Sequence, residues 1–298
     1  MVTKKEITMS DFAIVTDSSC DLPWETVKSL GLTVLPLSFI MGGKEYKNYP
    51  DNRSMSSEEF YTRIRKGELS KTSAVNVESF KNEMEKILKE GKDVLNIAFS
   101  SGLSNTFNAA KIACDELSEK YRERKIFVVD TLSASLGQGL LVYLAAKKKE
   151  AGETITDVRD WLEKNKLNLC HWFTVDDLKH LKRGGRISAA AALVGTMLSI
   201  KPVLHVDNEG RLVAVSKVRG RRASLNALVD QMEKTAIEPS EQTVFISHGD
   251  CPDDAEYVAG EIKRRMGVKN ILINTIGPVI GTHSGPGTLA LFFLGTQR

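Results

Sequence analysis

Short apolar runs alternate with amphipathic segments along most of this chain. Alternation of this kind predicts βαβ units and a mainly parallel sheet. Asp21-Leu22-Pro23 suit a helix N-terminus and Gly31 a helix end, and Ser56 with Glu59 has the spacing of a capping box. Strands are predicted at residues 12–16, 32–40, 94–99, 126–129, 169–173, 244–247 and 270–276, with one more after Lys201-Pro202. Helices are predicted at residues 21–31, from 56 onward, 76–89, 104–120, 133–149, 175–181, 223–235 and 252–266.

The pattern changes at residues 151–167, where Gly152, a charged helix and Lys164-Asn165-Lys166 resemble a connector. We therefore predict two α/β domains with mainly parallel sheets, at residues 12–165 and 166–298, after an N-terminal extension at residues 1–11.

Composition narrows the class of protein. The 298 residues are 42% hydrophobic and 27% charged, which is ordinary for a soluble globular protein and excludes a disordered chain. The 41 Lys and Arg against 38 Asp and Glu leave a net charge of +3, without the basic excess expected of a nucleic-acid partner. No apolar stretch approaches the roughly 20 residues that span a bilayer. The charged first residues are not followed by the apolar segment of a secretory signal, so none is predicted. We expect a cytoplasmic protein.

The four cysteines lie far apart and form no CxxC pair, so neither structural zinc nor a disulfide framework is predicted. No HxxxH pair indicates a metal, no GxSxG indicates an esterase, and no GxxxxGK[ST] indicates a bound nucleotide. We therefore expect no cofactor, no metal and no catalytic residue.

Polar loops follow the predicted strands, where ligands of parallel sheets bind. Ser100-Ser101-Gly102-Leu103-Ser104 joins a strand to a helix, so it suits an anion, or simply a capped helix whose turn needs glycine. Asp17 suits either a phosphate-accepting nucleophile or a carboxylate that accepts N–H bonds from its own loop. The second reading is favoured, because Ser19 occupies the place of a second catalytic Asp.

Two further loops combine glycine with a charged or titratable side chain. In the segment KRGGR, Lys182 and Arg183 suit an anion-binding loop or a solvated loop equally well. Arg186 enters an apolar stretch, where a guanidinium needs a partner. Residues 281–287 read GTHSGPG and hold His283 between glycines. The remaining histidines, His171, His180, His205 and His248, are interpreted as structural.

Taken together, these segments resemble the DegV family of bacterial fatty-acid-binding proteins. The resemblance extends from about residue 12 to residue 295, with the segments in the family's order. They are IVTDSSCDLP, KTSAVN, FSSGLSNTFNAA, VVDTLSASLGQG, FTVDDLKHLKRGGRIS, IKPVLHVDNEGRL, KVRGRRA and IGPVIGTHSGPG. Two positions depart from the family pattern: Ala74-Val75 replaces the usual Gln-Pro, and Asn105 replaces the usual Gly.

The resemblance implies a long-chain fatty acid held between two α/β domains. It also implies a partner, because some family members carry the acyl group for a separate ATP-binding fatty acid kinase subunit. The implied head-group site consists of Thr72, Ser73, Ser101, Ser104, Asn105, Arg186, Arg219 and His283.

Several points stay open at this stage. The apolar stretch at residues 189–198 and the pair Phe292-Phe293 are either walls of a lipid tunnel or plain core. If Arg219 turns inward, Arg221 and Arg222 form an outward pair. That pair suits either a solvated helix start, which is the commoner case, or a docking surface for the kinase. The alternative function is a small-molecule phosphotransferase or hydrolase related to dihydroxyacetone kinase subunits, with His283 holding the substrate.

Overall fold

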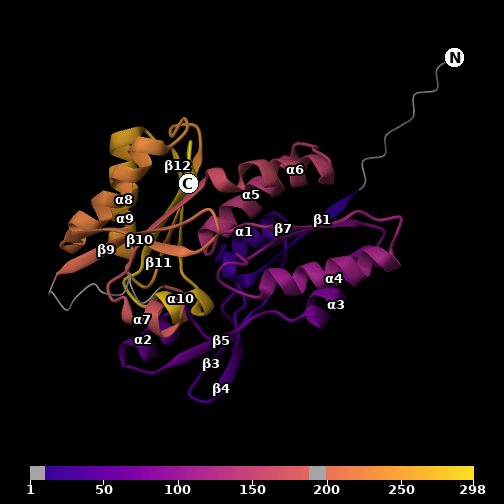
Figure 1. Cartoon of the computed structure of the whole chain (residues 1–298), viewed down its shortest axis with the longest axis horizontal. Coiled ribbons are helices and arrows are strands. Elements are labelled where there is room, and N and C mark those ends of the chain that lie inside the picture. Colours follow the sequence, from indigo (N-terminus) through magenta and orange to yellow (C-terminus); the bar gives the residue numbers. More distant parts are fainter. Residues whose placement is uncertain (1–10, 188–198) are drawn as a thin grey trace.

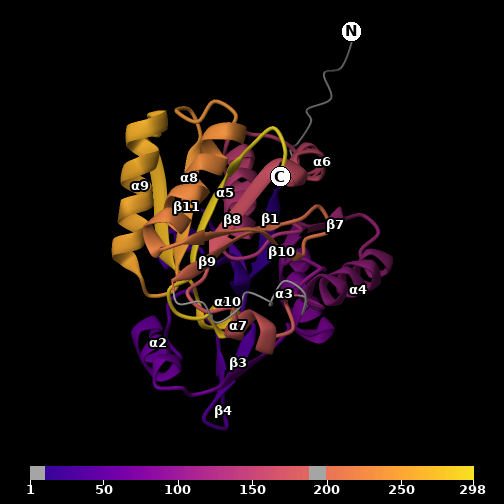
Figure 2. The ribbon, with the colours of Figure 1, turned by 60° about the vertical axis from the view of Figure 1, so that its left-hand side comes forward.

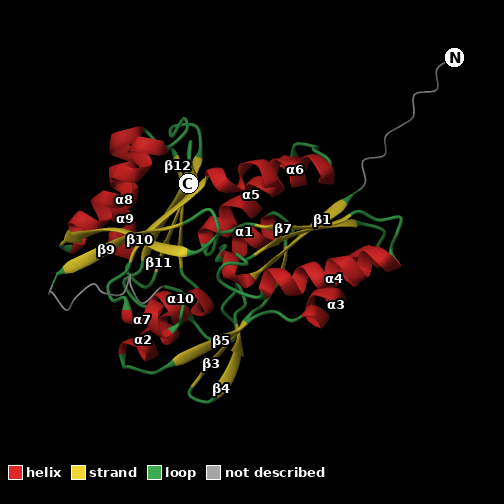
Figure 3. Cartoon of the chain, in the orientation of Figure 1, coloured by secondary structure: helices red, strands yellow, loops and turns green. Residues whose placement is uncertain are grey.

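The computed structural model describes residues 11–187 and 199–298, which form three sheets flanked by helices (Figures 1 and 3). The first sheet has four parallel strands in the order β2-β1-β6-β7. They are β1 (Phe12–Asp17), β2 (Thr33–Leu35), β6 (Asp93–Ala98) and β7 (Ile126–Asp130). The helices of this half are α1 (Trp24–Ser29), α3 (Val77–Lys89), α4 (Thr106–Lys120), α5 (Leu136–Glu150) and α6 (Ile155–Asn165). Successive side chains of β1 point to opposite faces of the sheet: Ile14 packs with α5 and α6, and Val15 with α3 and α4.

The second sheet has six strands in the order β10-β9-β8-β13-β11-β12. They are β8 (Leu169–Thr174), β9 (Ile200–Val206), β10 (Leu212–Arg219), β11 (Thr243–His248), β12 (Asn270–Thr275) and β13 (Leu289–Leu294). Its neighbouring strands run antiparallel except β11 and β12. The α/β class is confirmed, but the prediction of mainly parallel strands is wrong for this sheet. Two features cause this. Strands β8, β9 and β10 each run antiparallel to the next, and β13 enters between β8 and β11 and opposes both.

Helix α5 lies between these two sheets, and α8 (Arg221–Thr235) and α9 (Pro252–Met266) cover the far face of the second (Figures 1 and 2). Apolar residues surround most of α5, as expected of a helix buried on several sides. Gly137 and Gly139 permit this contact, because a side chain there would collide with Phe292 and with the Cys20 carbonyl, respectively.

A small antiparallel sheet, β4-β3-β5, projects from the other two (Figure 2). It consists of β3 (Ser38–Met41), β4 (Lys44–Lys47) and β5 (Ser70–Ser73), with α2 (Ser57–Arg65) beside it. The single strand predicted at residues 32–40 is wrong, because it is split into β2 and β3 at Pro36, which has no N–H for a sheet. Helix α10 (Pro278–Ser284) packs on this sheet and α2, and Tyr61 Oη donates to the Ile276 carbonyl at 2.9 Å.

The predicted N-terminal caps of two helices, α2 and α3, are confirmed. Ser56 Oγ accepts from Glu59 N at 3.1 Å and Asn76 Oδ1 from Ser79 N at 2.8 Å, as N-caps do. Three short helices complete the fold: η1 (Ser18–Cys20), η2 (Lys166–Asn168) and α7 (Lys179–Arg183). The domain boundary at residue 165 stays a prediction; the first and third sheets use residues 12–130 and the second uses residues 169–294. Within residues 11–187 and 199–298, no helix has the length and apolar character to cross a bilayer.

Candidate ligand-binding site

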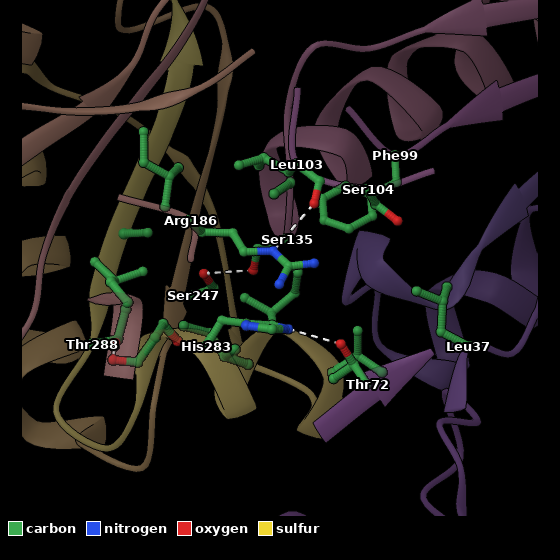
Figure 4. A pocket seen from close by; sticks show the side chains of 18 of the residues that line it. Leu37, Thr72, Phe99, Leu103, Ser104, Ser135, Arg186, Ser247, His283 and Thr288 are labelled. Carbon is green, nitrogen blue, oxygen red and sulfur yellow. Dashed lines mark hydrogen bonds between the residues drawn. The ribbon is translucent and has the colours of Figure 1, made fainter. Parts of the chain in front are cut away.

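A cavity of about 260 Å³ is lined by side chains from strands of the second and third sheets and from the loops that follow the strands of the first (Figure 4). Most of its wall is apolar. The apolar lining includes Leu37, Phe99, Leu103, Phe173, Val279 and Ile280. Hydroxyl, guanidinium and imidazole groups form the rest of the wall. Such a cavity fits a ligand with an apolar body and one polar group.

His283 and Thr72 form a direct contact at the polar part of this wall. His283 Nε2 lies 2.8 Å from Thr72 Oγ1, so helix α10 and strand β5 meet there. Burial, with Arg186 and Arg183 nearby, lowers the pKa of His283 to about 4, so its ring is neutral near pH 7. Its buried Nδ1 has no hydrogen-bond partner among the described residues. Gly184 is needed beside it, because a side chain at that position would collide with the imidazole.

Arg186 supplies a positive charge to the same wall. Its Nε donates to the Leu103 carbonyl at 3.3 Å, and Nη1 donates to the Gly184 carbonyl. The side chain is half-buried, and this burial lowers its pKa from the usual value. In the part of the chain that the structure describes, no carboxylate pairs with it. A half-buried guanidinium without a carboxylate partner favours an anionic ligand.

Three further predicted residues, Ser73, Ser104 and Asn105, also line this cavity. Ser104 Oγ accepts from Thr106 N at 3.2 Å and lies 2.9 Å from Thr106 Oγ1. Ser104 therefore also satisfies an N–H group in the first turn of α4. Its hydroxyl lies where the positive end of that helix adds to the charge of Arg186.

Two predicted residues lie apart from the cavity. Ser101 is exposed, and its N–H donates to Asp130 Oδ1 at 3.2 Å. Arg219 is exposed at the end of β10 and does not turn inward. The expected outward orientation is wrong for Arg221, which is largely buried and forms an ion pair with Asp254 at 2.8 Å, whereas Arg222 is exposed. Arg222 lies over the Tyr257 ring, 3.5 Å from its centroid.

Two segments were interpreted as either tunnel wall or core, and the structure decides between these roles for one of them. Phe292 and Phe293 are fully buried core residues and do not line the cavity; Phe292 packs against His171. The predicted wall at residues 189–198 lies outside the described residues.

Sequence reasoning missed two further hydroxyl groups of the cavity wall, those of Ser135 and Ser247. Ser135 Oγ donates to Asp21 Oδ2 at 2.6 Å and lies 3.0 Å from Ser247 Oγ, and both serines line the cavity. Asp21 does not cap α1 as predicted; its other oxygen accepts from Gly277 N at 3.0 Å. Burial raises the pKa of Asp21 to about 7. The serine-rich segment VVDTLSAS was the available signal for Ser135, whereas nothing local indicated Asp21.

The structural role favoured for Asp17 is confirmed. The side chain is fully buried and accepts from Ser19 N at 3.1 Å, Phe99 N at 2.9 Å and Gln138 Nε2 at 3.1 Å. These donors hold the loops after β1 and β6 together. Across residues 11–187 and 199–298, no three His, Cys, Asp or Glu side chains gather as a metal site requires.

Comparison with known proteins agrees with this fold over nearly the whole chain. The model of the family described as "Uncharacterised protein, DegV family" matches residues 11–296. A DegV domain-containing protein of Clostridium perfringens is 48% identical over 97% of this chain and 99% of its own.

Two solved structures at 30% identity superpose with a TM-score of 0.85. One is a DegV lipid binding protein from Thermotoga maritima, matched over 97% of this chain and 99% of that one. The other is a DegV family protein from Thermus thermophilus, described as binding fatty acid and matched over 96% and 99%. Sequence, family model and fold therefore agree that this chain belongs to the DegV family.

Proposed function

We propose that this protein binds a long-chain fatty acid, with the acyl chain among the apolar side chains of the cavity and the carboxylate at its polar wall. One observation carries the proposal: Arg186, half-buried and without a carboxylate partner among the described residues, borders a largely apolar cavity. The names of the Thermotoga and Thermus relatives, which refer to lipid and fatty acid, support it. In this proposal Thr72, Ser104, Arg186 and His283 hold the carboxylate, with Ser73 and Asn105 beside them.

The acyl chain and the head group contribute differently. Burying about 14 methylenes at roughly 0.8 kcal/mol each gives an upper limit of about 11 kcal/mol. A hydrogen bond to the charged head adds about 1.5–3 kcal/mol. The acyl chain therefore provides most of the affinity, and the polar groups fix which end of the ligand lies beside Arg186 and His283.

We further infer that the protein is a cytoplasmic carrier rather than a complete enzyme. Its sequence has no phosphate-binding GxxxxGK[ST] loop, which supports a phosphoryl donor bound by a separate ATP-binding subunit. In this role the chain presents the carboxylate, and the partner forms the acyl phosphate. The alternative, a phosphotransferase acting alone, predicts ATP consumption by the purified chain without any partner.

Native mass spectrometry tests the ligand directly. Protein purified from bacteria should carry an adduct with the mass of a long-chain fatty acid, and denaturing conditions should release it. Protein that contains no such adduct and also fails to take up palmitate or oleate would contradict the proposal. ATP turnover by the chain alone would favour the phosphotransferase.

Ser104→Ala should weaken palmitate binding only in part. The N–H groups at the start of α4 remain, and the acyl chain is unaffected, so affinity should fall by about 1–3 kcal/mol, the scale of one hydrogen bond to a charge. Loss of the Thr106 N–H contact should also lower the free energy of unfolding, by about 1 kcal/mol. Calorimetric titration and denaturant unfolding measure the two effects. Complete loss of binding in a folded variant would show that the head group, not the tail, dominates affinity.

A further inference from the structure

A second pocket, of about 390 Å³, lies beside Asp21, and none of its described lining residues lines the cavity above. Three segments form its wall: η1 with the start of α1, the loop from β4 to α2, and the end of β12 with the residues that follow. We call this space the Asp21 pocket. The proposed fatty acid site uses none of its groups, so the pocket has chemistry of its own.

Two asparagine side chains in this wall use their N–H groups on backbone oxygens. Asn48 Nδ2 donates to the Ser18 carbonyl at 3.2 Å, and Asn274 Nδ2 donates to the Asp21 carbonyl at 2.7 Å. No described residue donates to the side-chain oxygen of either asparagine. A Cβ atom at Gly277 would lie 2.7 Å from Asp21 Oδ1 and 3.2 Å from Asn48 Oδ1, so these two oxygens approach one point. The wall is therefore rich in hydrogen-bond acceptors.

Asp21 is a buried carboxyl group that lacks a counter-ion. Only 7% of its surface is exposed, and in residues 11–187 and 199–298 no Lys, Arg or His forms an ion pair with it. Its hydrogen bonds come from the Gly277 N–H at 3.0 Å and the Ser135 hydroxyl at 2.6 Å, which are neutral donors. Burial, with Asp17 nearby, raises its pKa to about 7, as expected for a carboxylate without a cation beside it. Such a group favours a cationic ligand.

The side chains around Asp21 do not supply that cation. The titratable groups that interact with it are Asp17, Cys20 and Tyr61, and none of the three is cationic. Among the described residues that line the pocket there is likewise no Lys, Arg or His. A cation would therefore meet a favourable field in this pocket, and an anion an unfavourable one.

Asp51 and Trp24 complete the wall. Asp51 is a second carboxylate, and its ion pair with Arg53, at 3.4 Å, neutralises part of its charge. Trp24 is 39% exposed, so an apolar ring borders this polar space. Lys28 Nζ lies 5.6 Å from the centroid of that ring, and it is itself paired with Glu25 at 2.7 Å. An indole beside carboxylates suits an ammonium group that carries an alkyl chain.

We propose that the Asp21 pocket binds the ammonium group of a small primary alkylamine. The Asp21 carboxylate is its counter-ion, and the side-chain oxygens of Asn48 and Asn274 accept its hydrogen bonds. Trp24 contacts the alkyl chain. An ammonium group brings three donors and no acceptor, which matches a wall of free oxygens. This site goes beyond the proposed function, because it uses no residue that lines the fatty acid cavity.

Butylammonium and 1-butanol test the need for charge, because they differ only in their ammonium and hydroxyl groups. Calorimetric titration of the full chain in phosphate buffer at pH 8 should show one butylammonium per chain and at least tenfold weaker binding of 1-butanol. Asp21→Asn should weaken butylammonium binding at least tenfold. Asp115→Asn is the matched control and should change it less than twofold, because Asp115 is exposed, pairs with Lys111 and lines neither space.

Proton release provides a second readout. At pH 6 Asp21 is mostly protonated, whereas butylammonium binds the ionised form. Binding should therefore release close to one proton per ligand at pH 6 and little at pH 8, and the affinity should rise about tenfold between these pH values. Titration at pH 6 in phosphate and in MES, which differ in heat of ionisation, counts the released protons. Asp21→Asn should release none.

Trp24→Leu covers the case in which Asp21→Asn fails to fold. Loss of the ring should weaken butylammonium binding at least threefold, and the exposed position leaves the core intact. Three results would overturn the inference: no saturable binding of butylammonium to the parent protein, equal affinities for butylammonium and 1-butanol, or an unchanged affinity in folded Asp21→Asn. Palmitate binding tests the proposed function separately.

Discussion

Arg186→Met should lower the affinity for palmitate by about 2–5 kcal/mol, which is the usual cost of removing one partner of a partly buried charge pair. Methionine keeps much of the length of the side chain and its contact with the apolar lining, but it has neither charge nor donors. The carboxylate would then face the neutral His283 and hydroxyl groups alone. Displacement of a fluorescent fatty acid by palmitate measures the effect.

The neutral ligand 1-hexadecanol provides the control for this variant. Its tail fills the same apolar cavity, but it has no charge for Arg186 to bind. Its affinity should therefore change by less than about 1 kcal/mol, because only packing differs. Equal losses for the acid and the alcohol would show that Arg186 supports the wall of the cavity and does not bind the head group.

Asp21→Asn should change how the free energy of unfolding depends on pH. Burial raises the pKa of Asp21 from an ordinary 3.8 to about 7, so the folded protein binds this proton more tightly than the unfolded chain does. The resulting stability is present below pH 4 and is lost as the pH rises through 7. Each unit of difference between the folded and unfolded pKa corresponds to about 1.4 kcal/mol. The free energy of unfolding should therefore fall by roughly 4 kcal/mol over this range. Asparagine cannot lose a proton, so the variant should not show this loss. Its free energy of unfolding, relative to that of the parent protein, should therefore rise by that amount between pH 4 and pH 8.5.

Denaturant unfolding at several pH values measures this difference. The substitution keeps the local geometry, because asparagine can accept from Gly277 N, donate to Ser135 Oγ and adopt the positive φ of 50° at this position. Asp115→Asn is the matched control: Asp115 is exposed, pairs with Lys111, and should alter the pH dependence by less than about 1 kcal/mol. Parallel stability curves for Asp21→Asn and the parent protein would contradict the assignment.

The sequence predicted the features that depend on local chemistry. Caps at Ser56 and Asn76 are visible within four residues, and the cavity-lining residues Thr72, Arg186 and His283 lie in distinctive short motifs. In contrast, the orientation of basic side chains near the end of β10 depends on a distant partner. Nothing near Arg221 reveals that Asp254 pairs with it, and nothing near Arg219 reveals that its side of the strand is exposed.

Features that depend on tertiary structure were predicted least well. Asp21 resembles an ordinary helix cap in sequence, yet its carboxylate bonds to Ser135 and Gly277, more than a hundred residues away. The second sheet was predicted as mainly parallel because helices and strands alternate along residues 221–275. That pattern cannot show where a later strand inserts: β13 enters between β8 and β11 and runs antiparallel to both.

The central position of β13 also has a consequence for how the protein is made. Strands β8 and β11 are synthesised well before residues 289–294, and both lack their shared neighbour until then. Until β13 arrives, each presents an unpaired edge, and such edges favour association between nascent chains. The contacts of β13 with β8 join residues about 120 positions apart, so they raise the contact order and slow folding. Completion of the second sheet is therefore a late step of folding.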